Sequence, residues 1–252
     1  MNSIQRNHIR TDQSQIFQRS FDRAGFPVQH ELTDHPLFSM PRIIKLARSL
    51  PRECIEYNAG NLQTGQDPKL TPANGLDPDE TIRRIKTCSS WLVLKSVEHD
   101  PEYRDLLFAC LDNVSGILAD QCPRMLAPRA FIFVSSPHAV TPFHIDPECQ
   151  FLLQIRGRKR IQIFDRFDRR VVSDTQLRDF WRGAHRNQPF SSDFNSLGEW
   201  HEMAPGTGIH LPVTAPHWVT VMDEVSISFS VTFETPTSQT VRDEYRSEDI
   251  CH

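Results

Sequence analysis

The stretch TPFHIDPECQ places a histidine and an aspartate two positions apart, at His144 and Asp146. Alternate residues of an extended strand point to the same face, so this imidazole and this carboxylate can bind one metal ion together. The spacing alone is a weak signal, because a chain with 11 histidines contains such pairs by chance. The pair is therefore a candidate metal site that needs a third ligand from elsewhere in the chain.

The best candidate for the third ligand is His217, which opens the strand-like stretch HWVTV. Two imidazoles and one carboxylate leave three adjacent metal positions open, which suits a non-haem Fe(II) that holds a chelating cosubstrate and O2. A structural zinc ion requires four ligands, usually with thiolates, and no cysteine is well placed for that role. His210 is the alternative third ligand. Three other histidines are interpreted as structural or surface residues: His138, His185 and His201.

Lys159 is the next residue whose position has chemical meaning. It begins the strand-like stretch KRIQIFD, where it shares a face with Ile161 and Ile163. A lysine that points into a core is costly unless it meets an anion. The alternative is a strand-end lysine whose ammonium reaches water. From the sequence alone both interpretations stay open.

Helices are predicted in the first half of the chain. Caps and apolar spacing predict helices over 39–50, over 77–88 and from Asp100 onward. Residues 1 to about 28 are polar and weakly patterned, which predicts an arm that packs late or frays. Residues 60–77 are rich in turn formers and predict a long loop.

Short strands are predicted from Arg129 onward, in AFIFVSS, FLLQIRG, KRIQIFD, GIHLP and HWVTV. A tight turn at Arg156–Gly157 is expected to join the second and third of these strands as neighbours. The stretch SDTQLRDFW predicts a helix with a capping box, and the alternation in VSISFSVTFE predicts a half-buried closing strand. Many short strands after a set of helices favour a barrel or jelly roll.

The stretch TPFHIDPECQFLLQIRGRKRIQIFD resembles, without a gap, the metal-binding segment of JmjC-type, cupin-like Fe(II)/2-oxoglutarate dioxygenases. It is most similar to the asparaginyl hydroxylase that acts on hypoxia-inducible factor. The later stretch GTGIHLPVTAPHWV is similar to the family's third-ligand segment. The first half of the chain resembles the family only loosely. The resemblance implies three iron ligands, His144, Asp146 and His217.

The resemblance also implies how the cosubstrate is held. Thr141 and Lys159 match the positions that bind the far carboxylate of 2-oxoglutarate, which gives an inward-facing lysine its anion. Gln150 stands where the asparaginyl hydroxylase has an asparagine near the cosubstrate. This is a departure from the family pattern, because the side chain is one methylene longer.

The activity implied is hydroxylation of a C–H bond, with 2-oxoglutarate and O2 converted to succinate and CO2. The alternatives are N-demethylation at the same iron centre and a cupin-like protein that binds a metal or ligand without turnover. The substrate stays open between a protein, a peptide, an amino acid and another small molecule. Segments 60–77 and 185–203 are expected to shape the opening of the site.

We therefore expect a mainly β (α+β) fold, a double-stranded β-helix core of the cupin/JmjC jelly-roll type with a helical N-terminal scaffold. One domain over 1–252 is predicted to divide into a mostly helical scaffold over 1–125, a catalytic jelly roll over 126–236 and a polar tail over 237–252. No apolar dimer helix is visible after the core, so monomer and homodimer both stay open.

The composition excludes several classes of partner. The chain is 38% hydrophobic and 24% charged with a net charge of −4, which gives no basic footprint for nucleic acid or an anionic membrane. The first residues, MNSIQRNHIRTDQSQ, lack the apolar segment of a signal peptide, and no apolar run is long enough for a membrane span. Six scattered cysteines without CxxC spacing fit a reduced, cytoplasmic protein.

Overall fold

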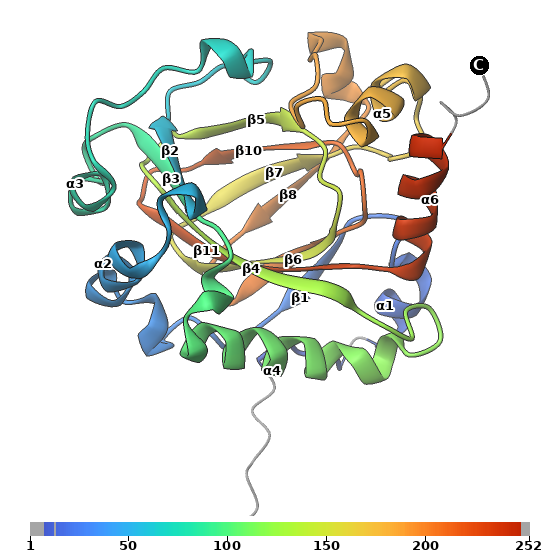
Figure 1. Ribbon diagram of the computed structural model, residues 1–252, viewed down its shortest axis with the longest axis horizontal. Helices are drawn as coiled ribbons and strands as arrows, with labels where there is room; N and C mark the ends of the chain where they lie inside the picture. Colours follow the sequence, from blue (N-terminus) through green and yellow to red (C-terminus); the bar gives the residue numbers. More distant parts are fainter. Residues whose placement is uncertain (1–7, 13, 248–252) are drawn as a thin grey trace, which may run out of the picture.

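The computed structural model describes residues 8–12 and 14–247, where two antiparallel β-sheets form the centre of the fold (Figure 1). The larger sheet has seven strands, in the spatial order β1 (Phe26–Gln29), β9 (Thr207–Leu211), β6 (Cys149–Arg156), β11 (Ser226–Glu234), β4 (Leu126–Ser135), β3 (Ser90–Leu94) and β2 (Ile55–Ala59). The smaller sheet has four, in the order β5 (Val140–His144), β10 (His217–Val221), β7 (Lys159–Ile163) and β8 (Glu199–Met203). The predicted jelly-roll core with added helices is confirmed.

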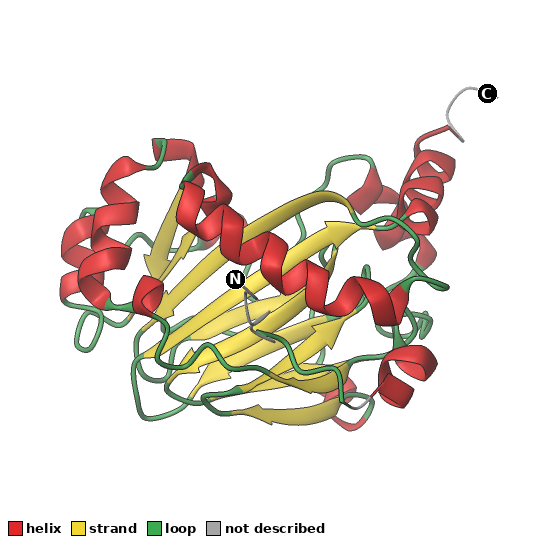
Figure 2. Cartoon of the chain, turned by 90° about the horizontal axis from the view of Figure 1, so that it is seen from below, coloured by secondary structure: helices red, strands yellow, loops and turns green. Residues whose placement is uncertain are grey.

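Helix α4 (Pro101–Leu118) covers the outer face of the larger sheet, across which it runs diagonally in Figure 2. Its buried residues include Leu107, Cys110 and Val114, which recur at helical spacing and form one apolar stripe. The helix begins after Asp100, whose carboxylate accepts a hydrogen bond from a backbone N–H of the first turn. The sheet thus has helix on one face and the smaller sheet on the other.

The remaining helices are α1 (Ser14–Ser20), α2 (Met40–Ser49), α3 (Pro78–Arg83), α5 (Asp174–Trp181) and α6 (Pro236–Ser247). The predicted helices over 39–50, over 77–88 and from Asp100 are confirmed as α2, α3 and α4, although α3 ends early, at Arg83. The capping box predicted before α5 is present. Among the described residues, no helix combines the length and the hydropathy needed to cross a membrane.

The first part of the chain is less helical than the sequence predicts, because it also supplies β1, β2 and β3 to the larger sheet. These strands are only four or five residues long, and β2 shows no alternation of buried and exposed positions. The predicted arm over 1–28 is also wrong where the structure describes it. Ile9, Phe17 and Phe21 are buried in the core, and β1 pairs with β9; residues 1–7 and 13 lie outside the described part.

The predicted polar tail over 237–252 forms helix α6 up to Ser247, and residues 248–252 lie outside the described part. Helix α6 packs beside α5 (Figure 1). Arg242 on α6 forms an ion pair with Glu234 at the end of β11, at 2.9 Å. The helix was not predicted because its sequence is almost entirely polar, and contacts with the core hold it in place.

The tight turn at Arg156–Gly157 is present, but β6 and β7 are not paired neighbours. β6 pairs with β9 and β11 in the larger sheet, whereas β7 pairs with β10 and β8 in the smaller one. Gly157 adopts a positive φ of 68°, and the Gln154 side-chain amide donates to the carbonyls of Arg156 and Gly157 at 2.7 and 3.1 Å. The turn therefore carries the chain from one sheet to the other and starts β7 at Lys159.

Strand β11 was predicted to be half-buried, but every residue from Ser226 to Phe233 is buried. Its alternation of serine with apolar residues reflects two different buried faces. The strand lies in the middle of the larger sheet, with α4 outside and the smaller sheet inside. Its serines bond to buried amides; for example, the Ser228 hydroxyl donates to the Gln154 side-chain oxygen at 2.6 Å.

His30 ties the N-terminal segment to the larger sheet as a neutral imidazole. Its Nε2–H donates to the Gln154 carbonyl at 2.9 Å, and its Nδ1 accepts from the Leu32 N–H at 3.1 Å. Burial lowers the pKa of His30 to about 4, against the opposing effect of hydrogen bonds to backbone carbonyls. Protonation would place a second N–H against the Leu32 N–H, so the folded state binds this proton less tightly than the unfolded state.

The stability contributed by neutral His30 is complete above pH 6.5 and decreases as the pH falls towards 4. At pH 5 this residue alone is expected to lower the free energy of unfolding by about 2 kcal/mol relative to pH 7.5. Urea unfolding at the two pH values measures the difference. His30→Gln is expected to shrink it, whereas replacement of the exposed His99 by glutamine leaves it unchanged. A pH difference of the same size in His30→Gln would contradict the assignment.

Candidate metal centre

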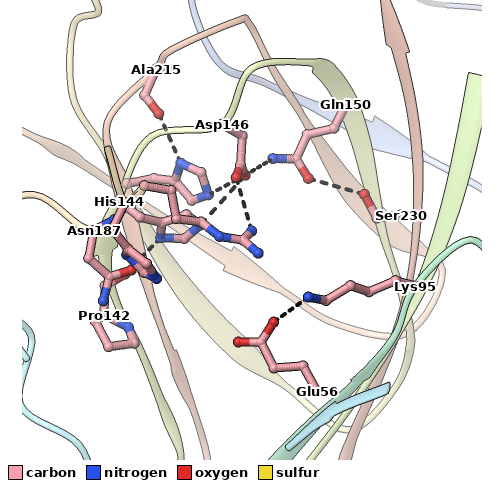
Figure 3. A network of polar contacts seen from close by, with 12 residues as sticks. Glu56, Lys95, Pro142, His144, Asp146, Gln150, Asn187, Ala215 and Ser230 are labelled. Atoms are coloured by element: carbon pink, nitrogen blue, oxygen red, sulfur yellow. Dashed lines mark hydrogen bonds and ion pairs between the residues drawn. The ribbon is translucent and has the colours of Figure 1, made fainter. Parts of the chain in front are cut away.

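The three predicted metal-ligating side chains meet at one point on the smaller sheet. His144 ends β5, His217 opens β10, and the two residues are direct partners across these antiparallel strands. The Nε2 atoms of His144 and His217 lie 3.5 and 3.8 Å from the same oxygen of Asp146, its Oδ2. One ligand atom from each residue lies within 4.8 Å of the other two (Figure 3). The pairing of β5 with β10 thus brings together residues that lie more than 70 positions apart in the sequence.

One detail differs from the sequence-based expectation. Asp146 does not share strand β5 with His144, since β5 ends at His144 and Asp146 lies in the turn that follows. The turn is attached to segment 185–203, the polar insertion between α5 and β9, because Ile145 N–H donates to the Arg186 carbonyl at 3.1 Å and Gln188 N–H donates to the Phe143 carbonyl at 3.0 Å. The carboxylate is therefore positioned by this added backbone pairing and not by strand alternation.

Both imidazoles are oriented by backbone carbonyls. Nδ1 of His144 lies 2.7 Å from the Pro142 oxygen, and Nδ1 of His217 lies 2.9 Å from the Ala215 oxygen. A carbonyl only accepts, so each Nδ1 carries the proton and each Nε2 keeps a lone pair facing Asp146. Burial, with a smaller contribution from His144, lowers the pKa of His217 to about 3, which keeps the ring in the neutral form that a metal requires.

Asp146 is held by two further side chains. Gln150 Nε2 donates to Oδ2 at 3.0 Å, and Arg186 donates to Oδ1 at 3.3 Å. The Ser230 hydroxyl fixes Gln150 by donating to its side-chain oxygen at 3.1 Å. Burial raises the pKa of Asp146, but His144 and then Arg186 outweigh it, so the pKa of the carboxyl lies below its usual range. The site thus presents two imidazoles and one carboxylate, with the Nε2 atom of each ring facing Asp146.

A cavity of about 200 Å³ opens beside this cluster, between the two sheets. Its walls come from both sheets, and they include Thr141, Lys159 and Val219 from the smaller sheet and Phe133, Gln150 and Leu152 from the larger. The loop after β2 and the insertion also contribute, through Leu62, Pro68 and Thr71 and through His185, Arg186 and Asn187. These two segments are those expected to shape the opening.

Lys159 points into this cavity and not to bulk water. Only 4% of the residue is exposed, and its Nζ lies 5.9 Å from the centre of the Phe133 ring. Burial lowers the pKa of Lys159 to about 7, and no described carboxylate pairs with it. Of the two interpretations left open by the sequence, the inward-facing lysine is therefore the one that the structure supports. A buried cation without a partner fits an anionic ligand in the cavity.

Thr141 lies close to Lys159 in the sheet. Val219 on β10 pairs with Thr141 on one side and with Ile161 on the other, and Ile161 shares its face of β7 with Lys159. The hydroxyl and the ammonium therefore face one cavity together with the ligand cluster. This arrangement fits a dicarboxylate that has one end at the metal and the other end at Lys159.

His210 was the alternative third ligand, and the structure places it elsewhere. It is fully buried among aromatic rings, with centroids 5.0 Å from Phe21, 4.8 Å from Phe26 and 4.9 Å from Phe151. Of the described residues, only the three predicted ligands form a group of side chains that could hold a metal ion. His185 was interpreted as a structural or surface residue, but it lines the cavity.

Several cavity residues were not identified from the sequence, among them Glu56, Asn58, Trp91, Lys95 and Arg186. Four of them lie on or next to β2 and β3, strands that no local sequence pattern predicts. Arg186 lies in a polar insertion without periodicity. No sequence pattern marks a single arginine in such a segment as a site residue. Only the fold places Arg186 next to the Asp146 carboxylate.

Comparison with known proteins places the chain in a family. Residues 112–241 match the JmjC domain family, which is 130 of the 252 residues. No curated protein matches the chain in sequence. The resemblance to the asparaginyl hydroxylase stays a prediction.

Two solved structures illustrate the shared fold. The X-ray structure of E. coli ycfD has a TM-score of 0.59 and 15% identity, over 90% of this chain and 54% of that chain. The structure of YcfD, a ribosomal oxygenase from Escherichia coli, in complex with cobalt and 2-oxoglutarate has a TM-score of 0.56 and 16% identity, over 91% of this chain and 53% of that one. This chain spans about half the length of these structures.

Together, the sequence match over half of the chain and the jelly-roll fold establish that the chain belongs to the JmjC domain family, a family of 2-oxoglutarate-dependent oxygenases that use Fe(II) and O2.

Proposed function

We propose that this protein is an Fe(II)- and 2-oxoglutarate-dependent dioxygenase that hydroxylates a C–H bond of its substrate and releases succinate and CO2. The observation that supports this most is the joint placement of the cluster His144, Asp146 and His217 and the unpaired cation of Lys159 in one cavity. A structural metal site has no use for that buried cation. A site that binds a dicarboxylate beside the metal requires it.

Each side chain has a definite task in this proposal. His144, Asp146 and His217 hold the metal on one side and leave the cavity side open. Lys159 and Thr141 bind the far carboxylate of 2-oxoglutarate by an ion pair and a hydrogen bond. Gln150 fixes Asp146, with which it shares a hydrogen bond of 3.0 Å. Its contact with the cosubstrate stays a prediction.

The bound iron supplies the oxidative chemistry, in which one O2 and one 2-oxoglutarate become succinate, CO2 and the oxygen of the product hydroxyl. The protein contributes orientation and exclusion of water. Apolar side chains of Phe133, Leu152 and Val219 line the cavity beside the polar groups. They limit the access of water to the reacting atoms.

The direct test is the Fe(II)-dependent conversion of 2-oxoglutarate to succinate in air, with and without added substrates. We expect succinate from the unmodified chain and from His99→Ala, and none from His144→Ala. Release of formaldehyde would instead identify N-demethylation at the same centre. Absence of succinate from a metal-loaded chain under all conditions would favour a binding protein without turnover. A cytoplasmic location and the oligomeric state stay predictions.

Lys159→Met is expected to raise the 2-oxoglutarate concentration for half-maximal turnover by about tenfold or more, the usual effect of losing a charged hydrogen bond. Methionine keeps the apolar stem, so the variant should not be less thermally stable without ligand than the unmodified chain. Succinate assays and thermal melts measure the two effects. Arg160→Met is the matched control, because Arg160 is the exposed neighbour on the other face of β7. An unchanged 2-oxoglutarate requirement would exclude Lys159 from the site.

A further inference from the structure

The cavity contains a second polar region that the iron and 2-oxoglutarate roles leave unused. It consists of Glu56, Asn58, Trp91 and Lys95, which we call the β2–β3 wall. Glu56 pairs with Val93 across the two strands and Asn58 pairs with Trp91, so these side chains point to one face of the larger sheet. That face is the one that lines the cavity with the ligand cluster.

The wall presents one negative and one positive charge side by side. Lys95 Nζ lies 2.5 Å from Glu56 Oε2, and 30% and 36% of the two side chains are exposed. Figure 3 shows Glu56 and Lys95 in contact with each other and apart from the side chains that contact Asp146. Both residues line the cavity that the ligand cluster also lines. The pair is therefore accessible from the cavity and is independent of the metal ligands.

The wall also has a hydrogen-bond donor that no described residue satisfies. The indole Nε1 of Trp91 is buried and has no hydrogen-bond partner among the described residues. A buried N–H without an acceptor is uncommon and costly. An acceptor on a ligand in the cavity removes that cost if it reaches this nitrogen.

We propose that the β2–β3 wall is the substrate subsite and that it binds the zwitterionic backbone of a free α-amino acid, with the ammonium on Glu56 and the carboxylate on Lys95. The inference rests on the proposed function. A ligand that carries only a positive charge pairs with Glu56 and leaves Lys95 without its anion. A ligand that carries only a negative charge pairs with Lys95 and leaves Glu56 without its cation. A zwitterion replaces both partners at once, so neither charge loses its counter-ion.

This binding mode also lets the side chain of the amino acid approach the metal site. The wall and the ligand cluster line one cavity, so an amino acid held by its charged backbone at the wall has its side chain free to extend towards the metal. Arg186 lines the same cavity and donates to Asp146 at 3.3 Å.

The test uses the full chain loaded with Co(II), which gives a visible spectrum without turnover under argon. 2-Oxoglutarate is added first, and its effect on the Co(II) spectrum tests the proposed function separately. The common free amino acids are then titrated one by one. The best of them is compared with its N-acetyl form, its methyl ester and its N-acetyl amide, which remove the cation, the anion and both charges.

We expect one or a few free amino acids to change the spectrum, and each single block to weaken binding by about tenfold or more. Glu56→Gln and Lys95→Met are expected to weaken binding of the free amino acid and to leave the 2-oxoglutarate titration unchanged. Glu202→Gln is the matched control, because it breaks an ion pair of the same length, with Arg158, on exposed side chains outside the cavity. It is expected to change neither titration.

Three outcomes overturn the inference. If the N-acetyl amide binds as well as the free amino acid, the wall accepts a neutral, peptide-like group and not a zwitterion. If 2-oxoglutarate changes the spectrum and no amino acid does, the substrate inference is wrong while the proposed function stands. If 2-oxoglutarate itself has no effect, the proposed function and the inference are both wrong.

Discussion

Asp146→Ala is expected to abolish the Fe(II)-dependent formation of succinate, to below about one hundredth of the unmodified rate. Asp146 is the only carboxylate among the three candidate ligands, and its Oδ2 is the atom that lies closest to both imidazoles. Without it, only two imidazole nitrogens hold a doubly charged ion, and the site loses its one negative ligand charge. Succinate formation and the dissociation constant for Co(II) are the measurements.

The fold is expected to survive this change. Asp146 lies in a turn, and its partner Arg186 has 44% of its side chain exposed and stays hydrated. Circular dichroism and the melting temperature of the metal-free variant check this point. Asp223→Ala removes an exposed carboxylate elsewhere and should change neither activity nor Co(II) affinity. Full activity in Asp146→Ala would show that the metal lies elsewhere.

Gly157→Ala is expected to have the largest effect on stability, a loss of about 3 kcal/mol in the free energy of unfolding. Gly157 has a φ of 68°, which costs an alanine about 1 kcal/mol. A Cβ at this position would also lie 2.2 Å from the Val225 carbonyl oxygen, so backbone must move at a cost of about 2 kcal/mol. Equilibrium urea unfolding measures the sum.

A matched control separates the two costs. Gly75 also has a positive φ, of 72°, but a Cβ there would meet no atom within 4 Å. Gly75→Ala is therefore expected to lose only about 1 kcal/mol. Because Gly157 lies two residues before Lys159, Gly157→Ala should also weaken 2-oxoglutarate binding at temperatures where the variant is folded. Equal losses for the two variants would contradict the role of the crowded turn between the sheets.

The ligand cluster was predictable because local residue types and the family resemblance point to the same three side chains. The spacing of His144 and Asp146 is a weak signal alone, and the resemblance to the JmjC family selects His217 over His210 as the third ligand. Lys159 was ambiguous in the sequence, since a strand-end lysine is equally compatible with water and with a cavity. Only the crossing of β7 into the smaller sheet decides between them, and it buries the residue.

The parts that were missed depend on pairing between distant segments. β2 and β3 are short, and nothing local identifies β3 as the neighbour of β4 or β2 as the neighbour of β3. Strands β6 and β7 were expected to be paired neighbours because two strands around a tight turn usually pair, but β11 and β9 flank β6 instead. Helix α6 lacks an apolar face in the sequence. In each case tertiary packing outweighs the local pattern.

The most direct test of the central claim is an anaerobic titration of the metal-free chain with Fe(II) and then with 2-oxoglutarate, followed by visible absorption. A 2-oxoglutarate that chelates Fe(II) gives a weak charge-transfer band. We predict that the band appears with the unmodified chain and with His99→Ala and is absent with His144→Ala, and that admitting O2 then yields succinate. Binding of Fe(II) without a band and without succinate would contradict the account, because the cluster would then hold a metal without this chemistry.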